Sequence, residues 1–179
     1  MQTSKHYTNQ TFTKHVDDEK GRHRTRRSLP EPAVCEICGD IYADRRWTKP
    51  NPEAKSERHP HFRPMQLVVC PACERQRSGV PSGYVYMQGK FLAEHQAELK
   101  RLLQNEAERA SEDNPLARIM DWQTEATSRD PAENRLVITT TTEHLAQRLG
   151  HALKKAYQGS VRYGFSQRNK LVRVWWERN

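Results

Sequence analysis

The stretches Cys35-Glu36-Ile37-Cys38 and Cys70-Pro71-Ala72-Cys73 decide the fold that we predict, because they hold all four cysteines of the chain in two C-x-x-C pairs, with 31 residues between the pairs. One C-x-x-C turn presents two sulfur atoms to a metal ion, and two such turns complete the tetrahedral ligand set of a structural zinc site. Four thiolates leave no open coordination position. We therefore expect Cys35, Cys38, Cys70 and Cys73 to bind one structural Zn²⁺ ion.

Other uses of these cysteines fit the sequence less well. Disulfides need an oxidising compartment, and residues 1–6 have no apolar export segment. A thioredoxin-like redox pair needs one C-x-x-C in a βαβ unit, whereas this chain has two matched pairs. His59 and His61 lie between the pairs and could replace a thiolate, but we interpret them as solvated loop residues.

The composition limits the size of the hydrophobic core and bears on whether the protein is expected in a membrane. The chain has 179 residues, 35% of them hydrophobic, and a mean hydropathy of −1.01. We therefore expect a small core and some loosely ordered chain. No apolar run approaches the eighteen or more residues of a membrane span, so we expect a soluble, cytoplasmic protein without membrane contact.

The net charge of +8 is unevenly distributed along the chain. Residues 134–179 contain nine Lys or Arg against two Asp or Glu, whereas residues 91–133 contain five against ten. A basic block of this kind favours contact with a phosphate backbone. Charge alone does not separate functional nucleic-acid binding from nonspecific attraction.

The cysteine spacing, the charge distribution and the expected helices and strands divide the chain into three parts. Residues 1–32 are predicted to form a disordered basic arm, residues 33–88 a zinc-binding module of treble-clef or zinc-ribbon type, and residues 89–179 an α+β domain. The proline-rich stretch 48–64 is predicted to be a surface excursion of the module. The arm could contact phosphates or act only as a solubilising tail, and we favour contact. Its candidate residues are Arg22, Arg24, Arg26 and Arg27.

The third part is predicted to have the order helix, two strands, helix, two strands, with a mainly antiparallel sheet. The first helix covers 89–110, and the strands cover 117–126 (with a helix as the alternative), 135–141, 160–165 and 171–178. The second helix is predicted to begin with a capping box of Thr140 and Glu143 and to stop at Gly159. Gly150 in its middle indicates close approach to a sheet or another backbone.

Basic and aromatic side chains are the candidate contacts for nucleic acid. His144, Arg148, His151 and Lys155 recur at steps of four, three and four, which places them in one stripe on the second helix. Arg162 and Arg173 on the last two strands add to this set. Trp47, Tyr84 and Trp175 could stack on an unpaired base, although core packing is the more common role of such residues.

Longer motifs suggest a family. They are Val-Ile-Thr-Thr-Thr-Thr-Glu-His-Leu-Ala-Gln-Arg-Leu-Gly at 137–150, His-Ala-Leu-Lys-Lys-Ala-Tyr-Gln-Gly at 151–159 and Val-Arg-Val-Trp-Trp at 172–176. Together with the two cysteine pairs, residues 33–177 resemble the zinc-containing N-terminal part of the nonsense-mediated decay protein three family, the archaeal and eukaryotic large-subunit export adaptors. The resemblance implies association with the ribosome or structured RNA. Because this chain stops at residue 179, we expect a short, stand-alone, bacterial-type relative without a role in export.

We therefore predict a zinc-stabilised, non-catalytic RNA- or ribosome-binding protein, such as a factor associated with the large subunit. The alternative is a protein–protein adaptor or regulator that docks a partner through the zinc module and the acidic helix at 89–110. A nucleic-acid-processing enzyme is less favoured, because the sequence contains no P-loop, dinucleotide-binding turn, H-E-x-x-H motif or nucleophile elbow.

Overall fold

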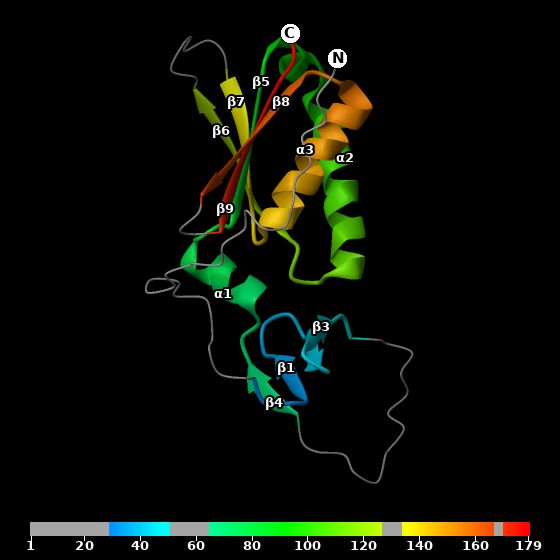
Figure 1. Cartoon of the computed structure of the whole chain (residues 1–179), viewed down its shortest axis with the longest axis vertical. Coiled ribbons are helices and arrows are strands. Elements are labelled where there is room, and N and C mark those ends of the chain that lie inside the picture. Colours follow the sequence, from blue (N-terminus) through cyan, green and yellow to red (C-terminus); the bar gives the residue numbers. More distant parts are fainter. Residues whose placement is uncertain (1–28, 51–64, 127–133, 167–169) are drawn as a thin grey trace, which may run out of the picture.

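The computed structural model describes residues 29–50, 65–126, 134–166 and 170–179. In this part of the chain, a small module that carries the cysteines lies at one end of a larger domain built from a sheet and two helices (Figure 1). Most of the predicted basic arm and of the proline-rich excursion, including His59 and His61, lies outside the described residues.

The small module is a four-stranded sheet followed by a helix. Its strand order is β3-β2-β1-β4, with β1 (Ala33–Cys35), β2 (Ile41–Ala43), β3 (Arg46–Thr48) and β4 (Gln66–Val68). Strand β1 pairs antiparallel with β2 and parallel with β4. Helix α1 (Pro71–Ser78), which the sequence did not predict, follows β4 and ends at Gly79 in the left-handed conformation.

The large sheet has five strands in the order β6-β7-β5-β9-β8. They are β5 (Gly83–Gln88), β6 (Ile119–Ala126), β7 (Asn134–Thr140), β8 (Ser160–Ser166) and β9 (Leu171–Glu177). All neighbours are antiparallel except β5 and β9, which are parallel. Both sheets are therefore mixed, and the prediction of a mainly antiparallel sheet is wrong. The reason is β5, which lies within the range 33–88 predicted for the zinc module but is the central strand of the large sheet.

Two helices cover one face of the large sheet, and the predicted order of helix, two strands, helix, two strands is present (Figure 1). They are α2 (Lys90–Asp113) and α3 (Glu143–Tyr157). The hydroxyl of Thr142, and not of Thr140, caps α3 by accepting from the backbone N–H of Leu145 at 3.2 Å. Thr140 belongs to β7, where its hydroxyl donates to the carbonyl of Thr142 at 2.8 Å. None of the helices in the described ranges is long and apolar enough to cross a bilayer.

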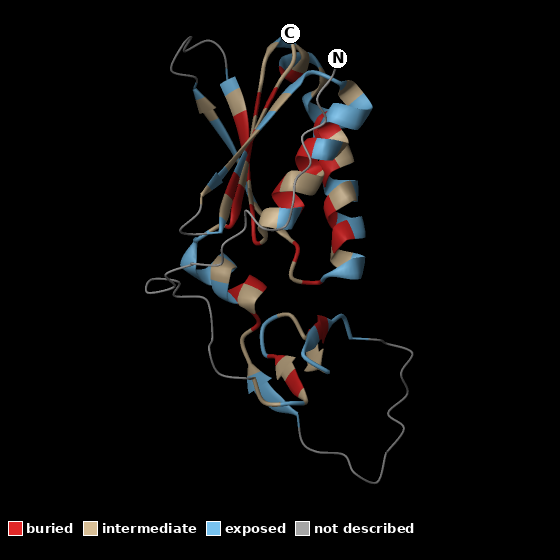
Figure 2. Cartoon of the chain, in the orientation of Figure 1, coloured by how far each residue is buried: buried red, intermediate tan, exposed pale blue. Residues whose placement is uncertain are grey.

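The main core lies between the large sheet and these helices, where the buried residues gather in Figure 2. Alternation along β9 buries Val172, Val174 and Trp176, as its sequence pattern predicts. Helix α3 lies unusually close to this strand, since a Cβ atom added at Gly150 would be 2.6 Å from Cγ1 of Val174. The glycine is therefore needed for the close approach of helix and sheet.

Candidate metal centre

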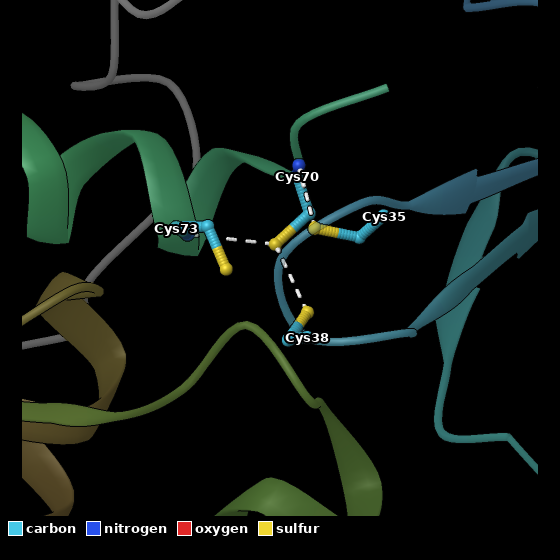
Figure 3. Close-up of side chains that lie close together, drawn as sticks. All are labelled: Cys35, Cys38, Cys70 and Cys73. Atoms are coloured by element: carbon cyan, nitrogen blue, oxygen red, sulfur yellow. Dashed lines mark hydrogen bonds between the residues drawn. The ribbon is translucent and has the colours of Figure 1, made fainter. Parts of the chain in front are cut away.

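The structure brings the four cysteines into one cluster, as Figure 3 shows. Their sulfur atoms all lie within 4.8 Å of one another, and Sγ of Cys38 is 3.7 Å from Sγ of Cys70. Tetrahedral thiolate coordination with bonds of about 2.3 Å places sulfur atoms about 3.8 Å apart. The cluster therefore has the dimensions of a site that could hold one metal ion.

Local structure delivers each pair of cysteines to the cluster. Cys35 ends β1, and Cys38 lies in the turn that leads to β2. Gly39 closes this turn with a φ of 79°, and its N–H donates to the carbonyl of Cys35 at 2.9 Å. Cys70 is the N-cap of α1, where its sulfur accepts from the N–H of Cys73 at 3.4 Å. A turn and a helix start thus hold the two halves of the ligand set.

The electrostatics of the cluster favour a bound cation. Burial opposes ionisation of Cys35, but the backbone N–H groups of Cys38, Cys70 and Ile37 donate to its sulfur and lower its pKa to about 6. Burial raises the pKa of Cys70 and of Cys73, and the negative charge of Cys38 raises both further. Because four thiolates at this spacing repel one another, the set fits a soft divalent ion that compensates their charge.

Apolar side chains of the small module pack against the cysteine cluster and shield it from solvent. Trp47 from β3 and Ala72 from α1 are buried against the cysteines. Tyr42 packs on Trp47 with ring centroids 5.2 Å apart, and Leu116 approaches from the large domain. Trp47 is thus a packing residue of the site, so it is not available to stack on a nucleic-acid base.

Arg118, in the loop between α2 and β6, links the cluster to the large domain. Its Nη2 donates to Sγ of Cys38 at 3.2 Å and also to the carboxylate of Asp40, and its Nη1 lies 3.5 Å from Sγ of Cys73. The Asp40 side chain is only 6% exposed and that of Arg118 is 23% exposed. Burial opposes the charge of Arg118, but the sulfur of Cys38 and the carboxylate of Asp40 outweigh this effect and raise its pKa.

Hydrogen bonds hold Arg118 in this position. Its Nε donates to the carbonyl of Pro115 at 2.7 Å, and its backbone N–H donates to the hydroxyl of Thr141 at 2.8 Å. A second bond between the two parts of the chain runs from Nζ of Lys49 to the hydroxyl of Ser111 at 2.9 Å. The cysteine cluster is therefore fixed to the large domain through side chains that no spacing in the sequence identifies.

The predicted basic stripe lies on the outer face of α3, where His144, His151 and Lys155 are exposed. Nδ1 of His151 is 3.3 Å from the hydroxyl of Tyr163. Arg148 turns toward α2 instead, where it forms ion pairs with Glu106 at 3.3 Å and Asp113 at 3.5 Å. Acidic side chains of α2 thus neutralise Arg148, one of the four residues of the stripe.

Other candidate residues lie on the face of the large sheet opposite the helices. The pairing register places Arg162 of β8, Arg173 of β9 and Arg135 of β7 on this face, each within cation–π distance of an aromatic ring. Tyr84 and Trp175, two of the three predicted stacking residues, lie there as well and are half-buried. Arg22, Arg24, Arg26 and Arg27 lie outside the described residues.

Comparison with models of protein families, with curated proteins and with solved structures found no match for this chain. Its function therefore has to be argued from the residues and their geometry.

Proposed function

We propose that this protein is a non-catalytic RNA-binding protein whose small module is held by one structural zinc ion. The observation that carries the proposal is the placement of Arg162 and Arg173 on the face of the large sheet opposite the helices, which no element of the described residues covers. Neither arginine forms an ion pair within the described part of the chain, so both charges are available to phosphates. Arginine binds phosphate oxygens through its planar fork of N–H donors.

Zinc is the metal that best fits the thiolate cluster. Structural sites with four cysteines are tetrahedral and closed, and the apolar shell around these cysteines leaves little room for a substrate. The small sheet has strands of only three residues, so it buries too little apolar surface to be stable without a metal. A turn that supplies one pair of ligands and a helix start that supplies the other are typical of a treble clef.

Charge distribution supports RNA as the partner. The acidic side chains Glu106 and Asp113 of α2 are directed toward Arg148, whereas Arg162 and Arg173 on the sheet face and Lys155 on the outer side of α3 form no ion pair within the described residues. Arg118 and Asp40 join the metal module to this domain, so the ion would keep both parts in one arrangement for binding. A rigid, positively charged surface of this kind suits a phosphate backbone.

Salt dependence of binding tests the proposal. For single-stranded RNA, the slope of log K against log salt is about −0.7 per neutralised phosphate. We expect the full-length protein to bind RNA with a clearly negative slope, and Arg173→Met to make that slope less steep by about 0.7. Arg148→Met is the matched control, because this arginine already has two acidic partners. Binding that is insensitive to salt would refute the proposal.

The ribosome is the target that the family resemblance implies. Co-sedimentation with purified ribosomal subunits, in the same salt series, would test this narrower proposal. Association with the large subunit that is lost in Arg173→Met would support it, whereas association only with free RNA would restrict the proposal to RNA in general.

A protein partner is the second candidate function, favoured by apolar side chains on the small module. Leu67 on the edge strand β4 is 71% exposed, and Ile37 in the first cysteine turn is 51% exposed. Exposed apolar residues on an edge strand are a common feature of docking surfaces. Crosslinking in lysate before and after nuclease treatment separates the candidates, since an adaptor would keep a dominant protein partner after the RNA is degraded.

A further inference from the structure

The uncovered face of the large sheet carries a continuous layer of aromatic rings and guanidinium groups. Tyr84 and Tyr86 alternate on β5, and Trp175 lies beside Tyr86 on the neighbouring strand β9. The rings of Tyr84 and Tyr86 are nearly parallel with centroids 5.9 Å apart, and those of Tyr86 and Trp175 are also 5.9 Å apart with an interplanar angle of 16°. The adjacent strands β5 and β9 thus present rings of similar orientation on this face.

Arginine side chains border each ring. The guanidinium carbon of Arg162 is 5.8 Å from the ring centroid of Trp175, that of Arg173 is 5.8 Å from Tyr84, and that of Arg135 is 5.0 Å from Tyr86. Gly164 leaves space for the large ring, because a Cβ atom there would be 2.9 Å from Trp175. Arg135 is paired with Glu125, whereas Arg162 and Arg173 form no ion pair within the described residues, and Glu177 is the acidic residue of β9 on this face.

A hollow of about 420 Å³ continues the layer at the end of β5. Tyr84 forms one wall of it, and Gln76 of α1 and Asp121 and Gln123 of β6 supply amide and carboxylate groups. The side chain of Gln123 donates to Asp121 at 2.8 Å, so this edge already contains oriented hydrogen-bonding groups. Such groups can contact the polar edge of a base whose face rests against an aromatic ring.

We infer that this face binds a segment of single-stranded RNA, with unpaired bases stacked on Tyr84, Tyr86 and Trp175 and phosphates paired with Arg162 and Arg173. The inference rests on the proposed RNA-binding function and names its substrate class. The aromatic layer identifies an occupant with exposed planar bases, and Arg162 and Arg173 beside the rings are the cationic groups that its phosphates would contact.

Double-stranded RNA fits this face less well. In a duplex the bases are stacked on one another and the major groove is deep and narrow, so proteins recognise it mainly through phosphates and 2′-hydroxyls. Half-buried rings on a broad sheet would then contribute nothing to binding. Binding of single-stranded RNA would therefore depend on the aromatic side chains, whereas binding of a duplex would not. Both forms of RNA would contact the arginines.

Fluorescence anisotropy with the full-length protein tests the inference. The probes are a labelled 12-nucleotide RNA without secondary structure and the same RNA annealed to its complement. We expect tighter binding of the single strand, and we expect Tyr86→Leu, which keeps every arginine, to weaken it by about fivefold to a hundredfold. Tyr84→Leu is the second variant if Tyr86→Leu unfolds. Phe165→Leu is the matched control, because this 63%-exposed aromatic residue of β8 lies on the opposite side of the sheet.

The outcomes separate this inference from the proposed function. If the unchanged protein bound neither probe, both would be wrong. If it bound the duplex as tightly as the single strand, and folded Tyr86→Leu and Tyr84→Leu proteins kept full affinity, RNA binding would stand but the stacking surface would be refuted. A loss of affinity equal to that of Phe165→Leu would refute it as well.

Discussion

Replacing Arg118 by methionine tests whether this side chain holds the cysteine cluster and the large domain together. Methionine keeps much of the apolar stem of arginine but removes the donors to Cys38, Cys73 and Asp40. A hydrogen bond to a charged group contributes about 1.5–3 kcal/mol, and a buried ion pair that loses one partner costs about 3–5 kcal/mol. Because Arg118 is 23% exposed, water can reach the carboxylate that remains, and we expect a loss of about 2 kcal/mol.

Two assays measure this effect. For a chain of this length, a loss of about 2 kcal/mol lowers the midpoint of thermal unfolding by about 4–8 °C. Competition with a chelator should show a metal affinity about tenfold or more below that of the unchanged protein, since groups that support thiolate ligands tune the metal. Arg109→Met is the matched control, because the Arg109 side chain is 66% exposed and its ion pair with Glu106, three residues away on the same helix, contributes about 0.3–0.5 kcal/mol.

A double-mutant cycle sharpens the test. If Arg118 acts through Asp40, then Arg118→Met combined with Asp40→Asn should destabilise the protein by less than the sum of the two single changes. Unchanged metal affinity and unchanged thermal stability in Arg118→Met would refute the reasoning, and so would an equal effect of Arg109→Met.

Three further predictions follow from the packing. Cys38→Ser should lower metal affinity and loosen the small module, which a change in the fluorescence of Trp47 would report; retention of full affinity would exclude Cys38 as a ligand. Gly150→Ala should destabilise the protein, measured by urea unfolding, by up to about 2 kcal/mol, because overpacking against Val174 costs about 1–3 kcal/mol and the gain in helix propensity is about 1 kcal/mol; a stabilised variant would show that the helix can shift. Thr142→Ala should cost about 1 kcal/mol through the lost cap of α3, and a neutral effect in the same assay would contradict that role.

Local patterns in the sequence were sufficient to predict most of the large domain. Alternation identified β9, and helical spacing identified α2 and α3, because burial of one face fixes those periods. The two C-x-x-C pairs predicted the cysteine cluster for a similar reason, since each pair is set by one tight turn or helix start. These features depend on residues that are near one another in the chain.

Strand β5 was missed although its sequence carries a signal. Gly-Tyr-Val-Tyr-Met-Gln alternates between half-buried and buried positions over its whole length, which is the period of a strand. Residues 83–88 were assigned to the end of the zinc module, so the strand was not recognised as the centre of the second sheet. Helix α1 was missed because it has only eight residues and no marked apolar face.

Long-range partners could not be predicted from local patterns. Arg118 lies 78 residues from Asp40, and no motif joins them. Helical spacing predicted a basic stripe on α3, but only the packing of α2 beside it shows that Arg148 faces Glu106 and Asp113. Tertiary contacts, and not helical spacing, therefore decide which basic side chains remain without an acidic partner and can bind a ligand.

Ultraviolet crosslinking of the full-length protein to RNA in cells, followed by mass spectrometry of the nucleotide-bearing peptides, tests the central claim most directly. Aromatic side chains that stack on bases are well placed to form such adducts. We predict adducts on peptides from β5 or β9, at Tyr84, Tyr86 or Trp175. A protein that carries no RNA adducts, or carries them only on α3, would contradict the account.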